Sequence, residues 1–260
     1  MTQPTPYPVL PLLTRGLAAG GLAGLASGLF SLLLAGPLLD RAVRLEEERE
    51  HATGAAHGHV HEELFSRGTQ HFGLVVTAVV TGLALGVFFA LAYALIHRST
   101  ALTHRPWQRA LLLAGAGFAA LSLLPGLRYP ADPPGVGESS TVAERQVLWL
   151  AALLIGILGL LAAWQLYRRL DRHPAPVRQT AAAAADAATA AALFLLPSHG
   201  DPVPLPADLV WEFRVLSLAA HTVLWAALGG LFGWLGLRGL PGHERNGAAG
   251  REPAPALAGG

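Results

Sequence analysis

The sequence predicts an all-α membrane protein, a polytopic bundle of about six transmembrane helices, or of five if the weakest segment does not cross. Two features of the composition support this fold class: 52% of the 260 residues are hydrophobic, and only 13% are charged. A soluble domain of ordinary composition carries about twice that share of charged residues. The third observation is a series of apolar segments, each long enough to cross the hydrocarbon core of a bilayer.

The apolar segments have the lengths that transmembrane helices need, because about 20 helical residues span roughly 30 Å of hydrocarbon. They are Gly16–Gly36, Phe72–Ile96, Trp107–Leu127, Val147–Leu166, Thr180–Leu196 and Val215–Leu237. Thr180–Leu196 is the weakest of them, because it is rich in alanine rather than leucine and contains Asp186. We expect this segment to need its neighbours in order to insert.

Two boundaries can be read from prolines and glycines. The first apolar segment ends at Gly36-Pro37 without a small-residue cleavage site, so we expect a retained helix rather than a signal peptide. The stretch from Tyr129 to Glu138 contains three prolines and two glycines, which exclude a helix and predict a semi-rigid turn.

Glycine recurs at four-residue intervals in three of the apolar segments. The positions are Gly16, Gly20, Gly24 and Gly28 in the first, Gly82 and Gly86 in the second, and Gly229 and Gly233 in the sixth. Small residues at this spacing let two helix backbones approach closely in lipid. The pattern predicts a tightly packed bundle and carries no indication of function.

The distribution of arginine predicts the orientation. With six spans, both termini share a compartment with the second and fourth connections, and these segments hold eleven of the eighteen arginines and three acidic residues. The other connections hold seven arginines and thirteen acidic residues. By the positive-inside rule, we expect both termini in the cytoplasm. The chain then divides into a short cytoplasmic N-terminus (1–15), a transmembrane domain (16–237) with an outward loop rich in His and Glu (37–71), and a disordered cytoplasmic tail (238–260).

Several functional classes are excluded by missing residues. The chain has no cysteine, so it has no thiolate nucleophile, Fe–S cluster or cysteine zinc site. All eighteen basic residues are arginine, and no P-loop motif occurs, so the chain by itself is not an ATP-driven pump of the P-loop class. A net charge of +1 without a basic patch does not indicate a nucleic-acid partner. No catalytic array is visible, and we do not expect an enzyme.

Metal-type ligands are concentrated after the first apolar segment, where five of the eleven histidines lie between His51 and His71. The candidate ligands are Glu46, Glu47, His51, His57, His59, His61, Glu62 and Glu63. Alternation at positions 57, 59 and 61 would place three rings on one side of an extended segment. Imidazole and carboxylate suit divalent ions such as cobalt, nickel, zinc and copper, so the motif does not name the metal. We favour metal capture over a solvated loop whose histidines only titrate near neutrality.

Two ionisable residues fall inside apolar segments. Asp186 lies in the middle of the fifth, and His221 lies about a turn and a half inside the sixth. Such groups are costly in lipid and mark a polar path or a buried partner. They are candidates for an intramembrane path, although Asp186 loses this role if its segment does not cross, and His221 also suits a hydrogen-bonded packing role.

Several blocks of the chain have no general physical explanation. They are Pro37-Leu38-Leu39-Asp40 after the glycine-rich first helix, Glu46-Glu47 with the histidine run and Glu62-Glu63, Ser66–Gln70, the Tyr-Pro-x-x-Pro-Pro-x-Val-Gly pattern within Leu127–Gly137, and Trp211–Arg214. In these blocks the chain resembles the CbtA family of cobalt transporter subunits. The similarity covers roughly residues 15–237. Family members tend to have Gln at the position of His221.

The resemblance implies cobalt uptake across the cytoplasmic membrane, linked to cobalamin biosynthesis, together with a small membrane subunit, CbtB, that carries its own histidine motif. Cobalt is then the transported substrate, although residue chemistry alone leaves nickel and zinc open. Two other readings remain. The protein could be a membrane metal-binding or assembly factor that does not transport, or a scaffold whose histidine loop responds to pH.

Overall fold

The computed structural model describes residues 9–52, 67–97, 106–134, 136–137, 139–198 and 203–238. Within these ranges the chain is helical and contains no strand. The elements are α1 (Val9–Phe30), the π-helix η1 (Ser31–Ala35), α2 (Gly36–Ala52), α3 (Arg67–His97), α4 (Pro106–Phe118), the π-helix η2 (Ala119–Leu123), α5 (Leu124–Arg128), the 3-10 helix η3 (Ser139–Thr141), α6 (Val142–Arg169), α7 (Ala175–Leu193) and α8 (Ala207–Arg238). The histidine run at 57–61, Glu62, Glu63 and the tail from 239 onward lie outside the described residues.

The predicted all-α membrane fold is confirmed, with five stretches in the described residues that are long and apolar enough to cross a bilayer. These are Val9–Leu45, His71–His97, Pro106–Arg128, Val142–Arg169 and Ala207–Leu237. The expected sixth segment forms α7, but this helix is not among the five. Alanine contributes little to transfer into lipid and Asp186 opposes it, so α7 does not qualify on its own composition.

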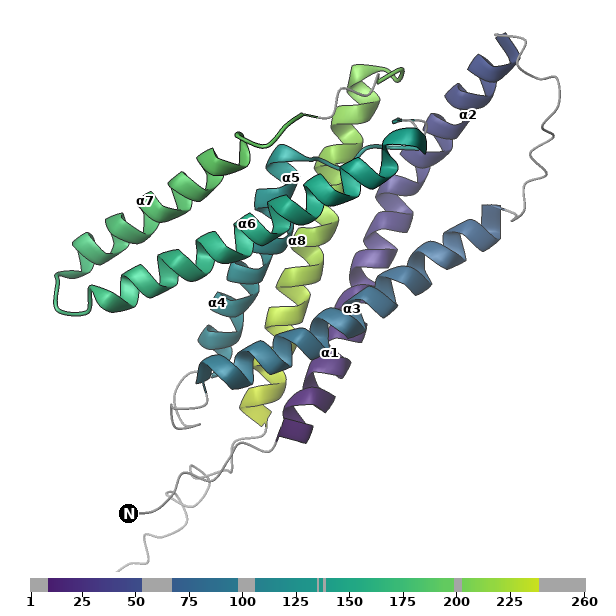
Figure 1. Ribbon diagram of the computed structural model, residues 1–260. Coiled ribbons are helices and arrows are strands. Elements are labelled where there is room, and N and C mark those ends of the chain that lie inside the picture. Colours follow the sequence, from purple (N-terminus) through teal and green to yellow (C-terminus); the bar gives the residue numbers. More distant parts are fainter. Residues whose placement is uncertain are drawn as a thin grey trace, which may run out of the picture.

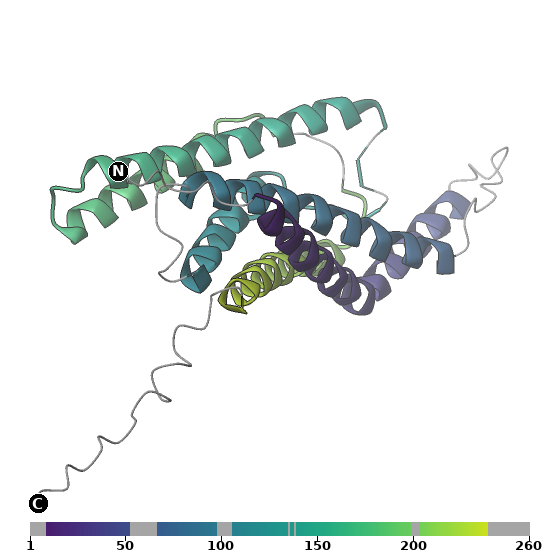
Figure 2. The same cartoon turned by 90° about the horizontal axis from the view of Figure 1, so that it is seen from below.

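Helix α7 nevertheless returns along α6, and the two lie together on one side of the bundle in both views (Figures 1 and 2). At one end of the bundle, the beginning of α1 lies beside the end of α8, as the contact between Arg15 and Phe232 shows. At the other end of the bundle, Ala42 of α2 packs against Leu209 near the start of α8. The continuous α1–α2 helix and α8 are therefore antiparallel neighbours.

The first helix does not stop at Gly36-Pro37, which differs from the end that the sequence indicated. Instead, α1 continues through η1 into α2, and the backbone N–H of Gly36 bonds to the carbonyl of Ser31, five residues back. Proline in a regular α-helix would collide with the carbonyl four residues before it. The π turn moves that carbonyl away from the ring of Pro37. Likewise, η2 precedes Pro125, and the backbone N–H of Leu124 donates a hydrogen bond to the carbonyl of Ala119, five residues back.

The glycine faces predicted from the sequence form the contact between α1 and α3 (Figure 1). A Cβ atom added at Gly20 would overlap the carbonyl oxygen of Gly82, and one added at Gly86 would overlap that of Gly16. Gly24 meets the backbone of residues 78 and 79 in the same way. The two helices thus touch backbone to backbone, and any side chain at these positions would separate them.

The main core joins α1, α3, α4 and α8, and it includes Phe89, Tyr93, Leu228 and Phe232. The guanidinium of Arg15 lies inside this group, 3.8 Å above the centre of the Phe232 ring. Its Nε donates a hydrogen bond to the Phe232 carbonyl. Arg15 therefore connects the beginning of the chain to its last helix by a cation–π contact and a hydrogen bond.

Candidate functional site

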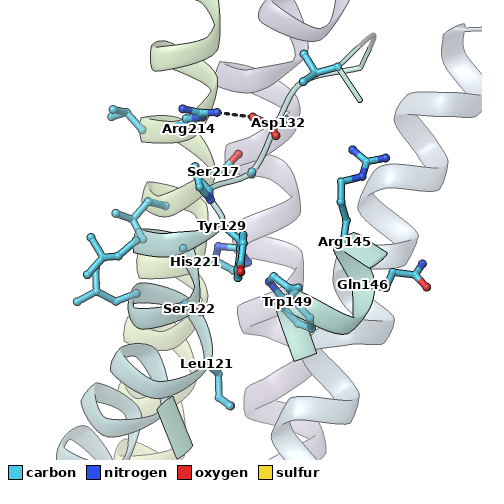
Figure 3. A pocket seen from close by; sticks show the side chains of 18 of the residues that line it. Leu121, Ser122, Tyr129, Asp132, Arg145, Gln146, Trp149, Arg214, Ser217 and His221 are labelled. Carbon is cyan, nitrogen blue, oxygen red and sulfur yellow. Dashed lines mark hydrogen bonds and ion pairs between the residues drawn. The ribbon is translucent and has the colours of Figure 1, made fainter. Parts of the chain in front are cut away.

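A pocket of about 870 Å³ lies between α5, α6 and α8 (Figure 3). Figure 1 shows that α6 and α8 begin at the end of the bundle where α2 ends. Its described polar lining consists of Ser122, Tyr129, Asp132, Arg145, Gln146, Arg214, Ser217 and His221. Leucine and tryptophan side chains form most of the remaining wall. The pocket thus lies between the proline-rich block, which starts at Tyr129 after α5, and the Trp211–Arg214 block in the first turns of α8.

Hydrogen bonds hold the proline-rich block in place. The Tyr129 hydroxyl donates to the Pro197 carbonyl at 2.6 Å, and Arg128 Nη2 donates to the Leu196 carbonyl at 2.6 Å. Both acceptors follow α7, so the turns after α5 and α7 are tied together. The turn is non-helical, as its prolines predicted. Its Gly137 has a φ of 91°, and the Arg145 guanidinium occupies the space where a side chain would stand.

An ion pair joins the two blocks across the rim of the pocket. Arg214 Nη2 lies 2.6 Å from Asp132 Oδ1, and the two side chains are 33% and 17% exposed (Figure 3). A charge-assisted hydrogen bond of this length in a half-buried place is among the stronger polar contacts in proteins. The sequence singled out both blocks, but it did not show that residues 82 positions apart are paired.

A second ion pair lies outside the pocket on the same end of the bundle. Arg41 Nη2 of α2 lies 3.5 Å from Asp208 Oδ2 of α8, and these side chains are 47% and 60% exposed. Beneath them, Ala42 packs with Leu205 and Leu209. The apolar contact holds α2 against α8, while the exposed pair contributes little.

A family model described as probable cobalt transporter subunit (CbtA) matches residues 10–236. The chain belongs to the CbtA family. The match runs from the first turn of α1 to the last turn of α8, so it includes both blocks at the pocket and all but the outermost residues of the five apolar stretches. No curated protein and no solved structure matches the chain. As a CbtA chain with five apolar helices, it is a multi-pass membrane protein and a subunit of a transporter.

In this CbtA chain, the two candidates for an intramembrane path lie on different parts of the bundle. His221 lines the pocket from α8 (Figure 3). Asp186 is exposed on α7, which packs along α6. The structure therefore does not bring these two side chains together, and each remains a separate hypothesis.

The candidate metal ligands of this CbtA chain fall at the edge of the described residues. The structure describes the backbone of Glu46, Glu47 and His51 as part of α2. The side chains of these three residues and the remaining candidate ligands lie outside the described part. Among the residues that the structure does describe, no group of three or more His, Asp or Glu is placed to hold a metal ion. The predicted capture site thus stays a prediction.

Proposed function

We propose that this CbtA-family chain takes up Co²⁺ across the cytoplasmic membrane for cobalamin biosynthesis, after an outward segment rich in His and Glu has collected the ion. The observation that carries the proposal is the family match over residues 10–236. The chain also contains a dense run of nitrogen and oxygen ligands suited to this class of ion. No thiolate is present to divert a softer metal.

Helix α2 supports this role by its length. The apolar stretch that begins in α1 ends at Leu45, but the helix continues to Ala52. Seven further residues extend the helix by about 10 Å beyond the apolar stretch. Positions 47 and 51 are one turn apart, which is the spacing at which a carboxylate and an imidazole on a helix can share one ion. We propose that α2 holds the first ligands above the bilayer surface.

The path through the membrane is proposed to involve a partner. The family description names a subunit, so a second component is implied. We propose a small CbtB-like membrane protein with which this chain forms the path, and His221 or Asp186 would contribute from this side. Both residues lie in helices, and neither has a described metal ligand cluster around it.

Cobalt uptake by cells that express the chain alone, with its partner, or with neither tests this function. We expect cobalt accumulation only when the chain is present, and no comparable accumulation of nickel or zinc. Binding of cobalt by the purified chain without accumulation in any of these cells would favour the membrane assembly factor instead.

Replacement of His57, His59 and His61 by alanine should raise the cobalt concentration for half-maximal uptake by on the order of tenfold or more. Loss of a residue that only hydrogen-bonds to a metal ligand already costs about tenfold in affinity, and these histidines are proposed as direct ligands. Capture should also weaken below about pH 6.5, because coordination requires neutral imidazole. The control is His173→Ala, at an exposed turn between α6 and α7. An unchanged concentration dependence at normal protein level would reduce the segment to a linker.

The proposed orientation places both termini in the cytoplasm, on the basis of arginine counts. A reporter fused after Gly260 should therefore be active in the cytoplasm only. Reporters inserted after His173 and after Pro197 bracket α7, and we expect them in opposite compartments. Equal location of these two reporters would show that α7 does not cross and would place the C-terminus outside.

A further inference from the structure

The hairpin formed by α6 and α7 joins the rest of the bundle near one end. Gly156 of α6 meets the backbone of Ala120 in η2, and Leu193 of α7 packs in one cluster with Tyr129, which follows α5. From there the hairpin diverges from α4 towards its own turn, as both views show (Figures 1 and 2). The part of α7 before Thr189 therefore has α6 as its main described neighbour.

Asp186 is exposed on this part of α7, and it makes no hydrogen bond or ion pair with any described residue. It lies one turn before Thr189, whose side chain packs against Gly159 of α6. The nearest described arginine along α7 is Arg178, which is eight residues and about 12 Å away. The guanidinium of Arg178 already donates to the Tyr167 carbonyl and stacks on its ring. The carboxylate of Asp186 is therefore not neutralised within the described part of the chain.

The level of Asp186 lies inside an apolar stretch. Helix α6 forms the stretch Val142–Arg169, and Gly159 is ten residues, or about 15 Å, from its end. Since Thr189 contacts Gly159, Asp186 lies one turn closer to that end and still about 10 Å inside it. A charged side chain within a spanning stretch is costly unless it faces a polar path or a partner. In a bilayer, Asp186 therefore needs an opposite charge from outside the described chain.

Neither a metal ion nor a second copy of the chain supplies that charge well. Among the described residues, no group of three or more His, Asp or Glu is placed to hold an ion with Asp186. At the same end of the bundle, a second copy would offer Arg15 at a similar depth, but this guanidinium lies in the core against Phe232. The family description names a subunit, which implies a different partner. A basic residue of that partner is the source that remains.

We propose that the exposed side of α7 around Asp186 is the docking surface for a transmembrane helix of the partner subunit, and that this helix places a basic residue against Asp186. The surface consists of Gln179, Ala183, Asp186 and Ala187, which are exposed and share one side of α7. Its alanines let a second helix approach closely. The docking surface rests on the partner that the proposed function requires, and it assigns Asp186 to assembly rather than to the ion path.

Co-purification of a tagged CbtB-like subunit with the full-length chain in mild detergent tests the proposal. We expect Asp186→Asn to lower the amount of co-purified subunit on the order of tenfold, because a charge-assisted contact at the interface is lost. Asp186→Glu keeps the charge and should retain most of the subunit. The matched control is Asp171→Asn at the exposed turn between α6 and α7, which should keep the wild-type amount. An intact complex with lost cobalt uptake in Asp186→Asn would overturn the proposal and place Asp186 on the ion path.

Disulfide crosslinking locates the interface without any change at Asp186. The chain has no cysteine, so Ala183→Cys introduces its only thiol. We expect this variant to crosslink to a single cysteine placed in the transmembrane helix of the tagged subunit. Val80→Cys, at an exposed position on α3, should not crosslink to it. Crosslinks between two copies of the chain, or to the subunit from Val80→Cys alone, would overturn the docking surface.

Failure of the docking surface and failure of the proposed function give different results. Normal co-purification and normal cobalt uptake with Asp186→Asn would remove the docking surface and leave the proposed function in place. A complex that depends on Asp186, in cells that accumulate no cobalt, would support the docking surface and remove the transport function. Cobalt uptake by a wild-type chain that never retains the subunit would remove the partner, and the docking surface with it.

Discussion

Gly86→Ala is expected to destabilise the chain, because its new Cβ would overlap the carbonyl oxygen of Gly16. Neither group can move away, since both belong to helix backbones in direct contact. Overpacking of this kind costs about 1–3 kcal/mol. For a chain of this size, that corresponds to a midpoint of thermal unfolding roughly 2–12 °C lower. Thermal unfolding of the purified protein in detergent measures the effect.

The matched control is Gly73→Ala on the same helix. A Cβ at this position meets nothing within 4 Å. Alanine is the better helix former by up to about 1 kcal/mol, so the control should be neutral or slightly more stable. Equal midpoints for the two variants would show that α1 and α3 are not in backbone contact.

Asp132→Ala should cost about 1–3 kcal/mol of unfolding free energy, because it leaves Arg214 partly buried without its partner. The estimate lies below the roughly 3–5 kcal/mol typical of fully buried pairs, since the two side chains keep some exposure. Arg214→Ala should have a similar cost. The double variant should cost clearly less than the sum of the two single variants, because both remove the same interaction.

The exposed pair on the same end of the bundle provides the comparison. Asp208→Ala removes a contact of 3.5 Å between side chains that are about half exposed, so a change between about 0 and 1 kcal/mol is expected. Strictly additive effects of Asp132→Ala and Arg214→Ala, each no larger than that of Asp208→Ala, would show that the pair does not hold the proline-rich block to α8.

The bundle could be predicted because its determinants are local in sequence. Apolar length identified the spans, and the four-residue glycine spacing identified the faces that α1 and α3 share. The same local reasoning treated Pro37 as an end to the helix. It was wrong there, because a π turn five residues long accommodates the ring, and such a turn has no composition signal of its own.

The candidate site could be predicted only in part. The proline-rich block and Trp211–Arg214 were recognised as unusual, but their meeting depends on the way α5 and α8 pack, which no local pattern encodes. The sequence held one signal, because Asp132 and Arg214 each have apolar residues on both sides in the chain, and an ion in apolar surroundings needs a partner. The histidine run lies outside the described residues, so its role stays a prediction.

The contact of Arg15 with Phe232 has a consequence for the order of events during synthesis. The two residues are 217 positions apart, and at about 5–20 residues per second the ribosome needs roughly 10–40 s to make the intervening chain. The glycine faces of α1 and α3 are complete long before that. We expect nascent α1 to pair with α3 first, which brings Arg15 within 5.7 Å of the centre of the Tyr93 ring. The contact of Arg15 with Phe232 forms only after α8 is translated. Docking of α8 is then the last step, and it closes a bundle whose other half is already formed.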